Sequence, residues 1–158
     1  MKSGLRILGA MLAVALTGAQ AGPPANPVLG TWKFNVAKST FTPGPGWRSQ
    51  TRTYSAEPGG GVLVRWTGIG AHGEPMYLDF VSRLDGKDYP MTGSANYDTI
   101  NSVRIDALTV KSEEKRGGKV VGIAIRKVSP DGKVLTITDE GTNRKGERFS
   151  QVLVFDRE

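Results

Sequence analysis

The chain has 158 residues, a formal net charge of +6, no cysteine and a single histidine, His72. Its length is that of one ordinary domain and excludes a two-domain enzyme. The absence of cysteine excludes disulfides, thiolate nucleophiles and zinc–thiolate sites, and one histidine excludes any site that needs two imidazoles. The 21 glycines and 9 prolines, with only 38% hydrophobic residues, favour a turn-rich β protein over a helical bundle.

Residues 1–21 are typical of a secretory signal peptide. A basic start with Lys2 and Arg6 precedes an apolar run over 7–16 and the small-residue ending Ala19-Gln20-Ala21. The apolar run is short for a membrane span, so a retained anchor is the less favoured alternative. We expect cleavage near Ala21, which leaves 137 residues with a net charge of +4, and a periplasmic or secreted location.

A short Pro/Gly leader over 22–27 precedes one predicted domain over 28–158. In this domain, turn residues recur at the roughly 8–12-residue spacing typical of an all-β meander, sandwich or barrel. Turns such as Asp85-Gly86 and Gly117-Gly118 indicate tight hairpins and hence antiparallel neighbours. We expect strands over 28–36, 48–56, 61–69, 75–84, 87–92, 99–106, 108–115, 119–128, 133–139 and 147–156.

Four of these segments alternate apolar and polar residues, which predicts one buried face on each. The predicted inward faces are Trp32, Phe34 and Val36; Met76, Leu78 and Phe80; Val121, Ile123 and Ile125; and Phe149, Leu153 and Phe155, the last set interrupted by Gln151. An open sheet of about ten strands would expose its edges, which favours closure into an antiparallel meander barrel of about 8–10 strands. A two-sheet sandwich is the rival architecture.

The first predicted strand contains Gly30-Thr31-Trp32 within the longer pattern GTWKFNVAKS over 30–39, followed by SQTRTY over 49–54 and DGKDYP over 85–90. These segments resemble the calycin superfamily of lipocalins and their relatives, and within it small, exported, mostly uncharacterised bacterial lipocalin-like proteins. The resemblance covers the mature chain. It implies a meander barrel whose narrow end is closed by Trp32, with a late arginine, Arg148 or Arg157, packed on that tryptophan.

The chain departs from the fatty-acid-binding branch of this superfamily. Proteins of that branch carry a helix-turn-helix lid after the first strand and a late Arg-x-Tyr that holds a carboxylate. Here residues 37–47 are too few for two helices, and the chain ends Phe155-Asp156-Arg157-Glu158. We therefore carry over neither the lid nor the carboxylate clamp.

No catalytic constellation is evident, and we expect a protein that is not an enzyme and holds no metal or cofactor. His72 lies in a predicted hairpin loop over 70–74, without a second ligand, which favours a solvated turn histidine. The adjacent acidic residues Glu113-Glu114 and Asp139-Glu140 point to opposite faces of a strand, so neither pair is suited to joint acid–base work. A calycin-type enzyme that uses only Tyr, Asp and Arg is the least favoured alternative.

The aromatic and aliphatic side chains of the predicted inward faces are candidates to line a ligand cavity, although each alone is more often plain core. The candidates are Trp32, Phe34, Trp66, Leu78, Phe80, Ile123, Phe149 and Phe155. Trp47 follows a Pro/Gly-rich loop, so it either folds back onto the barrel or gates an opening. Arg52 and Arg104 would bind an anionic ligand head if they pointed inward, but we expect them to be outward and solvated.

The leading hypothesis is non-covalent binding of a small apolar or amphipathic molecule inside the barrel. The alternative is an envelope interaction module with a filled barrel, acting through its surface and basic loops; export makes nucleic acid a poor partner. The basic loop residues are Lys115, Arg116, Lys119, Arg144, Lys145 and Arg148. An open cavity would favour the ligand-binding hypothesis, and a filled interior would favour the interaction module. An inward Asp–Tyr or Asp–Arg pair would favour the calycin-type enzyme.

Overall fold

A computed structural model describes residues 26–158, so the predicted signal peptide and residues 22–25 of the leader lie outside the described residues. Over the described part, no helix is long and apolar enough to cross a membrane. The strands are β1 (Gly30–Phe34), β2 (Thr40–Thr42), β3 (Ser49–Ala56), β4 (Val62–Ile69), β5 (Pro75–Ser82), β6 (Tyr89–Thr92), β7 (Thr99–Arg104), β8 (Thr109–Arg116), β9 (Lys119–Val128), β10 (Val134–Thr142) and β11 (Arg148–Arg157). All ten predicted strands are present, and β2 is the one that was not predicted.

Ten strands form a closed antiparallel barrel. Sequential neighbours pair from β3 to β11, and β1 pairs with both β3 and β11, which closes the ring; β2 lies outside it, on β11. The hairpin between β8 and β9 turns on Gly117 and Gly118, whose positive φ angles of 57° and 75° suit a two-residue turn. The antiparallel meander barrel is therefore confirmed and the sandwich is excluded.

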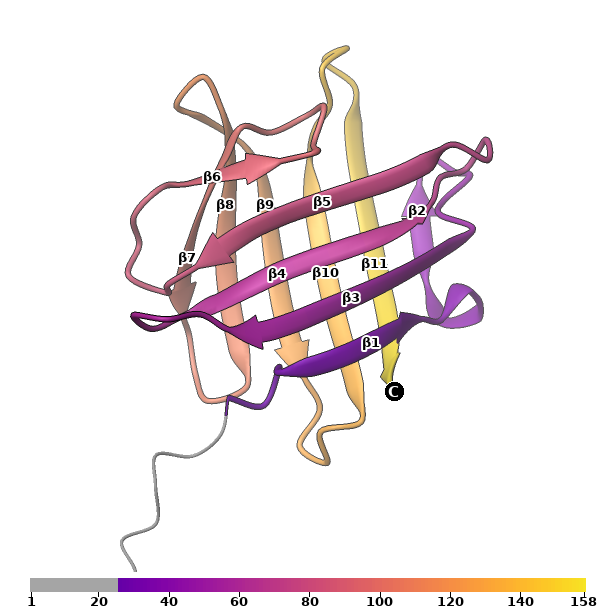
Figure 1. Ribbon diagram of the computed structural model, residues 1–158. Coiled ribbons are helices and arrows are strands. Elements are labelled where there is room, and N and C mark those ends of the chain that lie inside the picture. Colours follow the sequence, from indigo (N-terminus) through magenta and orange to yellow (C-terminus); the bar gives the residue numbers. More distant parts are fainter. Residues whose placement is uncertain (1–25) are drawn as a thin grey trace, which may run out of the picture.

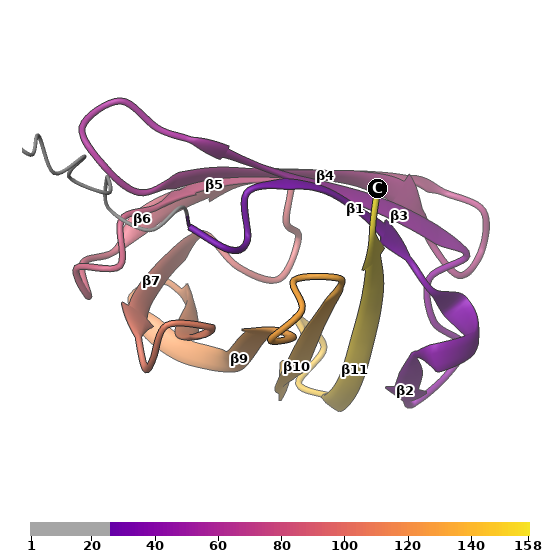
Figure 2. The ribbon, with the colours of Figure 1, turned by 90° about the horizontal axis from the view of Figure 1, so that it is seen from below.

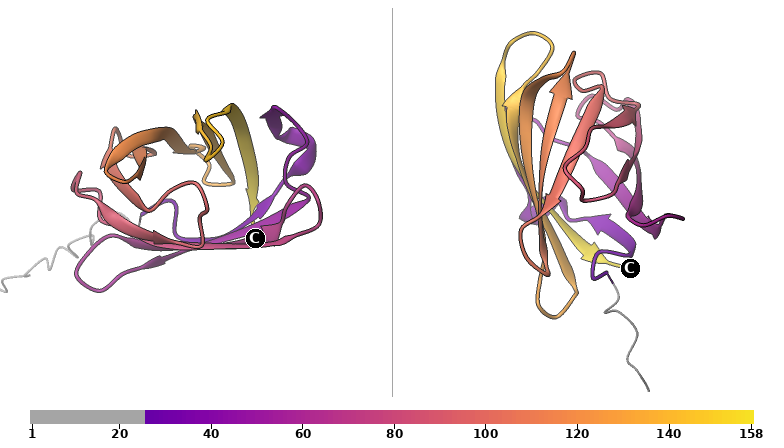
Figure 3. Two further views of the ribbon diagram at one scale, coloured as in Figure 1. Left: turned by 90° about the horizontal axis from the view of Figure 1, so that it is seen from above. Right: turned by 90° about the vertical axis from the view of Figure 1, so that its left-hand side faces the viewer.

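The barrel is flattened into two layers that face each other across the interior. One layer contains β1 and β3 to β5, and the other contains β7 to β11, whose strands run across those of the first (Figures 1 and 2). The side views show the layers diverging to enclose the interior between them (Figure 3). Strand β6 connects the layers and is weakly attached, with two residue pairs to β5 and two to β7.

The segment between β1 and β3 is a single 3-10 turn, η1 (Val36–Lys38), followed by β2. It contains no pair of helices, as the short spacing over 37–47 predicts. The side chain of Asn35 caps η1 by accepting a hydrogen bond from the backbone N–H of Lys38. Because the chain leaves β1 after Phe34, Val36 does not continue the inward face of that strand. Its predicted burial is wrong, since 53% of the residue is exposed.

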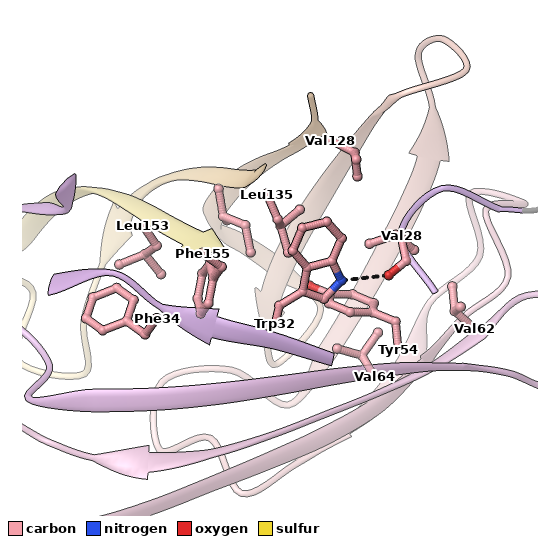
Figure 4. Packing of buried hydrophobic residues seen from close by; sticks show 11 residues of the cluster. Val28, Trp32, Phe34, Tyr54, Val62, Val64, Val128, Leu135, Leu153 and Phe155 are labelled. Atoms are coloured by element: carbon pink, nitrogen blue, oxygen red, sulfur yellow. Dashed lines mark hydrogen bonds between the residues drawn. The ribbon is translucent and has the colours of Figure 1, made fainter. Parts of the chain in front are cut away.

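Trp32 anchors the filled end of the barrel. Its indole is completely buried, and Nε1 donates a hydrogen bond of 2.8 Å to the carbonyl oxygen of Val28 (Figure 4). The guanidinium of Arg157 lies 4.1 Å from the centre of the indole and donates to the carbonyl oxygen of Leu29. Of the two arginines implied by the resemblance, Arg157 is thus the one that packs on Trp32. The surrounding core comprises Val28, Phe34, Tyr54, Val62, Val64, Val128, Leu135, Ile137, Leu153 and Phe155.

We expect Trp32→Ala to reduce the free energy of unfolding by about 3–5 kcal/mol, because it removes a fully buried ring and leaves a cavity. Urea denaturation monitored by circular dichroism measures the change. Val36→Ala, on an exposed side chain nearby, should change stability by less than about 0.5 kcal/mol. Equal effects of the two substitutions would contradict the role assigned to Trp32.

Candidate functional site

Beyond this core the barrel encloses a cavity of about 430 Å³, which lies within the size range of small-molecule sites. Its lining extends to four loops, over 43–47, 70–74, 93–97 and 143–147, and several of the lining loop residues are exposed. The barrel is thus filled around Trp32 and hollow toward these loops. The interaction-module hypothesis requires a filled interior, whereas the described residues leave a cavity.

One wall of the cavity is apolar. It is formed by Trp66, Leu78, Phe80, Met91 and Ile100, from the consecutive strands β4 to β7. Met91 and Ile100 were not among the predicted lining residues, because β6 and β7 are too short for their alternation to be clear.

Trp47 folds back from its loop onto this apolar wall. Its ring meets Trp66 edge to face, with 5.0 Å between ring centres and 88° between the planes. It lines the cavity where loop 43–47 meets the wall, which agrees with the expectation that the side chain is not stranded in solvent.

The predicted cavity residues fall into three groups. Trp66, Leu78, Phe80 and Phe149 line the cavity. Three others, Trp32, Phe34 and Phe155, are packed in the core at the filled end and are not part of the lining. The eighth, Ile123, does not face the interior.

The inward face of β9 is the opposite of the predicted one. Ala124 and Arg126 line the cavity, so Ile123 and its apolar neighbours Val121 and Ile125 lie on the outer face. The prediction assumed that the apolar face of a strand points inward. On β9 that assumption fails, because its inward face borders a cavity with a polar wall rather than packed core.

Arg52 on β3 faces the cavity, so its predicted outward position is wrong. Its Nε donates a 2.6 Å hydrogen bond to Oε1 of Gln50, and its guanidinium lies 5.6 Å from the ring centre of Trp66. Arg104, by contrast, is exposed at the end of β7, donates to the carbonyl oxygen of Ala107, and lies outside the cavity lining. Its outward position agrees with the sequence expectation.

A second arginine, Arg126, shares the cavity with Arg52. Its guanidinium lies 5.1 Å from the ring centre of Tyr54. Burial lowers the pKa of Arg126, and the charge of Arg52 adds to the effect. Among residues 26–158, no carboxylate lies within ion-pairing distance of either guanidinium. Away from its exposed rim, where Arg148 also lines it, the cavity therefore contains two cations without directly paired counter-ions.

The same polar wall holds two buried carboxyl groups, Glu114 on β8 and Asp139 on β10, which are 9% and 7% exposed. They lie on either side of β9, close enough for the negative charge of Asp139 to raise the pKa of Glu114. As predicted, the neighbours within Glu113-Glu114 and within Asp139-Glu140 point to opposite faces of their strands. The proximity of the two inward members was not predicted, because it depends on how the strands pair.

Local register explains how the two carboxyl groups meet. Glu114 pairs with Gly122 of β9, where an added Cβ would lie 2.7 Å from Oε2 of Glu114, so glycine leaves the space that the carboxyl occupies. Asp139 pairs with Gln151 of β11, whose Nε2 donates a 2.6 Å hydrogen bond to Oδ2 of Asp139. The interruption of the apolar face by Gln151 is therefore the sequence signal that marked this site.

Burial, and after it the nearby negative charge of Asp139, raise the pKa of Glu114 to about 8. Burial also raises the pKa of Asp139 to about 6, against the opposing effects of the Gln151 hydrogen bond and the charge of Arg52. Tyr97 lies near Glu114, and burial together with the charge of Glu114 raises the pKa of this tyrosine as well. Near neutral pH the pair therefore holds one proton and one negative charge.

Of the remaining candidate residues, Arg148 lines the exposed rim of the cavity, and the others lie outside the cavity or hold its loops. His72 is exposed in the loop between β4 and β5, and its backbone N–H donates to Glu74. Of the basic loop residues, Lys115 pairs with Asp88 at 2.7 Å, and Arg116 donates to the carbonyl oxygen of Asn96. Over the described residues, no group of three or more His, Asp or Glu side chains is placed to hold a metal ion.

Comparisons with known proteins support the fold. No protein-family model matches the chain, and no curated protein matches its sequence. Among solved structures, the crystal structure of the wild-type fluorescent protein UnaG is similar, with a TM-score of 0.54 and 15% sequence identity over 82% of this chain and 96% of the UnaG chain. The barrel thus has a lipocalin- or calycin-like fold, as the first-strand motif implies.

The carboxyl pair should make the protein less stable as the pH rises. The pKa of each carboxyl group is higher in the folded protein than in an unfolded chain, where it is about 4. Between the unfolded and the folded pKa values, the folded state therefore binds more protons than the unfolded state. Stability is then lost as the pH rises through about 6 and about 8. We expect the thermal midpoint to fall between about pH 5 and pH 9, and to fall less in Glu114→Gln.

Glu113→Gln, which alters the outward neighbour, is the control and should keep the wild-type profile, measured by differential scanning calorimetry. Identical pH profiles for wild type and Glu114→Gln would contradict the assignment.

Proposed function

We propose that the protein binds a small amphipathic anion, non-covalently, in the cavity of its barrel. The observation that carries this proposal is a cavity of about 430 Å³ with an apolar wall on one side and two arginines without directly paired counter-ions on the other. UnaG supports the fold of this site and not the identity of its ligand.

The apolar wall would stabilise the complex by removing ligand surface from water. Trp66, Leu78, Met91 and Ile100 are each less than a tenth exposed, yet all reach the cavity. Each square ångström of apolar surface buried contributes about 25 cal/mol. A ring system or a short alkyl chain suits this wall better than a polar metabolite.

Charge balance in the interior of the cavity favours an acid group at the other end of the ligand. Arg148, Glu74 and Glu147 also line the cavity, but they are exposed at its loop rim, where water screens their charges. In the interior, Arg52 and Arg126 carry two positive charges, and the pair of Glu114 and Asp139 carries one negative charge when it holds a proton. A single negative charge on the ligand would bring this interior to neutrality. Buried charges are costly unless compensated, so a carboxylate or sulfonate is favoured over a cation.

A second candidate is a calycin-type enzyme. It is favoured by the inward Glu114, which lies near Tyr97, and by Asp139, whose pKa is lowered by the charge of Arg52. A neutral acid beside a carboxylate can donate and accept a proton at the same pH. Steady consumption of a bound molecule, followed by mass spectrometry, would distinguish turnover from binding. We retain binding and an exported location in the bacterial envelope as the principal proposal.

Blocking the cavity should abolish uptake of an apolar probe. We expect the wild type to enhance the fluorescence of N-phenyl-1-naphthylamine, and Ala124→Leu, which fills space on the inward face of β9, to weaken its binding at least about tenfold. The control, Ile125→Leu, changes the adjacent outward position and should bind as the wild type does. Equal binding by both variants would place the probe outside the barrel and contradict the proposal.

Removing one arginine should weaken binding of an anion selectively. 8-anilinonaphthalene-1-sulfonate has the ring system of the first probe with a sulfonate added. We expect Arg52→Met to weaken binding of the sulfonate about tenfold and to leave the neutral probe nearly unchanged. Arg65→Met, on an exposed side chain of β4, should affect neither. Equal losses for both probes would show that Arg52 supports the structure of the cavity rather than the charge of its ligand.

A further inference from the structure

Glu114 and Asp139 place two unpartnered carboxyl oxygens in the same cavity wall. Oε2 of Glu114 and Oδ1 of Asp139 are buried, and neither has a hydrogen-bond partner among the described residues. Two ionised carboxylates have only acceptor atoms, so neither oxygen can be satisfied by the other group until one of the groups is protonated. The carboxyl pair is thus suited to bind a proton.

The environment indicates which member carries the proton. Nε2 of Gln151 donates to Oδ2 of Asp139 at 2.6 Å, and a bound amide N–H favours the ionised form. Glu114 lies over Gly122, where burial opposes its charge. Asp139 is therefore the carboxylate and Glu114 the acid at neutral pH.

Charged and titratable groups face the carboxyl pair from several elements. Arg52 on β3 lowers the pKa of both carboxyl groups, and Tyr97, from the loop before β7, lies close enough to Glu114 for the charge of that carboxyl to raise the pKa of the tyrosine. Arg126 lines the same cavity from β9, with Tyr54 of β3 beneath it. The negative charge of Glu140, on the outer face of β10, makes a smaller contribution that raises the pKa of Asp139. The groups within the cavity are those that an anionic ligand would also meet.

We propose that the carboxyl pair is a proton-binding subsite of the cavity, through which the protein takes up an organic anion together with a proton. This inference rests on the proposed function, which it deepens. An anion that enters beside Arg52 and Arg126 brings a negative charge close to a carboxylate on the same cavity wall. Protonation of the pair removes that repulsion, so the proton and the anion favour each other's binding.

The linkage has a defined sign. At low pH both carboxyl groups are neutral, the two arginines are uncompensated, and anions bind most tightly. At high pH both carboxyl groups are ionised, their charges offset those of the arginines, and anions bind most weakly. A ligand without charge should respond much less to the same titration.

The test compares two probes that differ only in the sulfonate group. 8-anilinonaphthalene-1-sulfonate keeps its negative charge over the whole pH range, so any change in affinity originates in the protein. We expect its dissociation constant to rise at least about tenfold between about pH 5.5 and pH 9, and that of N-phenyl-1-naphthylamine to stay nearly constant.

Two double variants complete the test. Glu114→Gln with Asp139→Asn replaces both inward carboxyl groups by neutral amides and should make the affinity for the sulfonate nearly independent of pH. Glu113→Gln with Glu140→Gln removes the same charges from the adjacent outward positions and should retain the wild-type dependence. If the inward double variant does not fold, Glu114→Gln alone takes its place in the same pH titration. This single variant keeps the hydrogen bond from Gln151 to Asp139 and should reduce the pH dependence of the affinity for the sulfonate.

The outcomes separate the two proposals. If the wild type binds the sulfonate with an affinity independent of pH, or if the inward variants keep the dependence, the proton subsite is overturned while the binding function stands. If neither probe binds, or if Ala124→Leu leaves the binding of both probes unchanged, the proposed function itself fails. The proton subsite then fails with it.

Discussion

The pairing of β1 with both β3 and β11 is the constraint on which the rest of the structure depends. It joins the first and last strands of the barrel and brings Trp32 into register with Arg52 on one side and Arg157 on the other. Trp32 can then be fully buried beneath the guanidinium of Arg157. Packed side chains close one end of the barrel, so most of the buried apolar surface that stabilises the fold through the hydrophobic effect lies at that end. The opposite end is free to hold a cavity.

The cavity owes its chemistry to a few cross-strand neighbours rather than to a contiguous motif. Asp139 meets Gln151 directly across β10 and β11, and Glu114 reaches over Gly122 from β8. Arginines enter from β3 and β9, and the apolar wall comes from β4 to β7. The charged and the apolar side chains thus come from different strands, and only closure of the barrel brings opposite charges and apolar rings around one space.

Much of the fold could be predicted from the sequence, because period-two alternation and glycine turns are local signals. They located the ten barrel strands, and the first-strand motif placed Trp32. The site was harder to predict. Alternation shows two faces but not which one is inside, so β9 was assigned the wrong way round. The meeting of Glu114 with Asp139 depends on register between strands, which composition and spacing do not contain. Arg52 was expected outside because burial of a charge is rare without a partner.

The weak attachment of β6 has a consequence for how the barrel accommodates what it holds. With only two residue pairs to each neighbour, β6 opens at a lower free energy than β10 and β11, which share nine. Met91 of β6 belongs to the apolar wall, whereas Trp32 lies among the firmly paired strands. The barrel is therefore easier to deform on the side of β6 than at its packed end around Trp32. The cavity can widen for ligands of different size while the packed end keeps its shape.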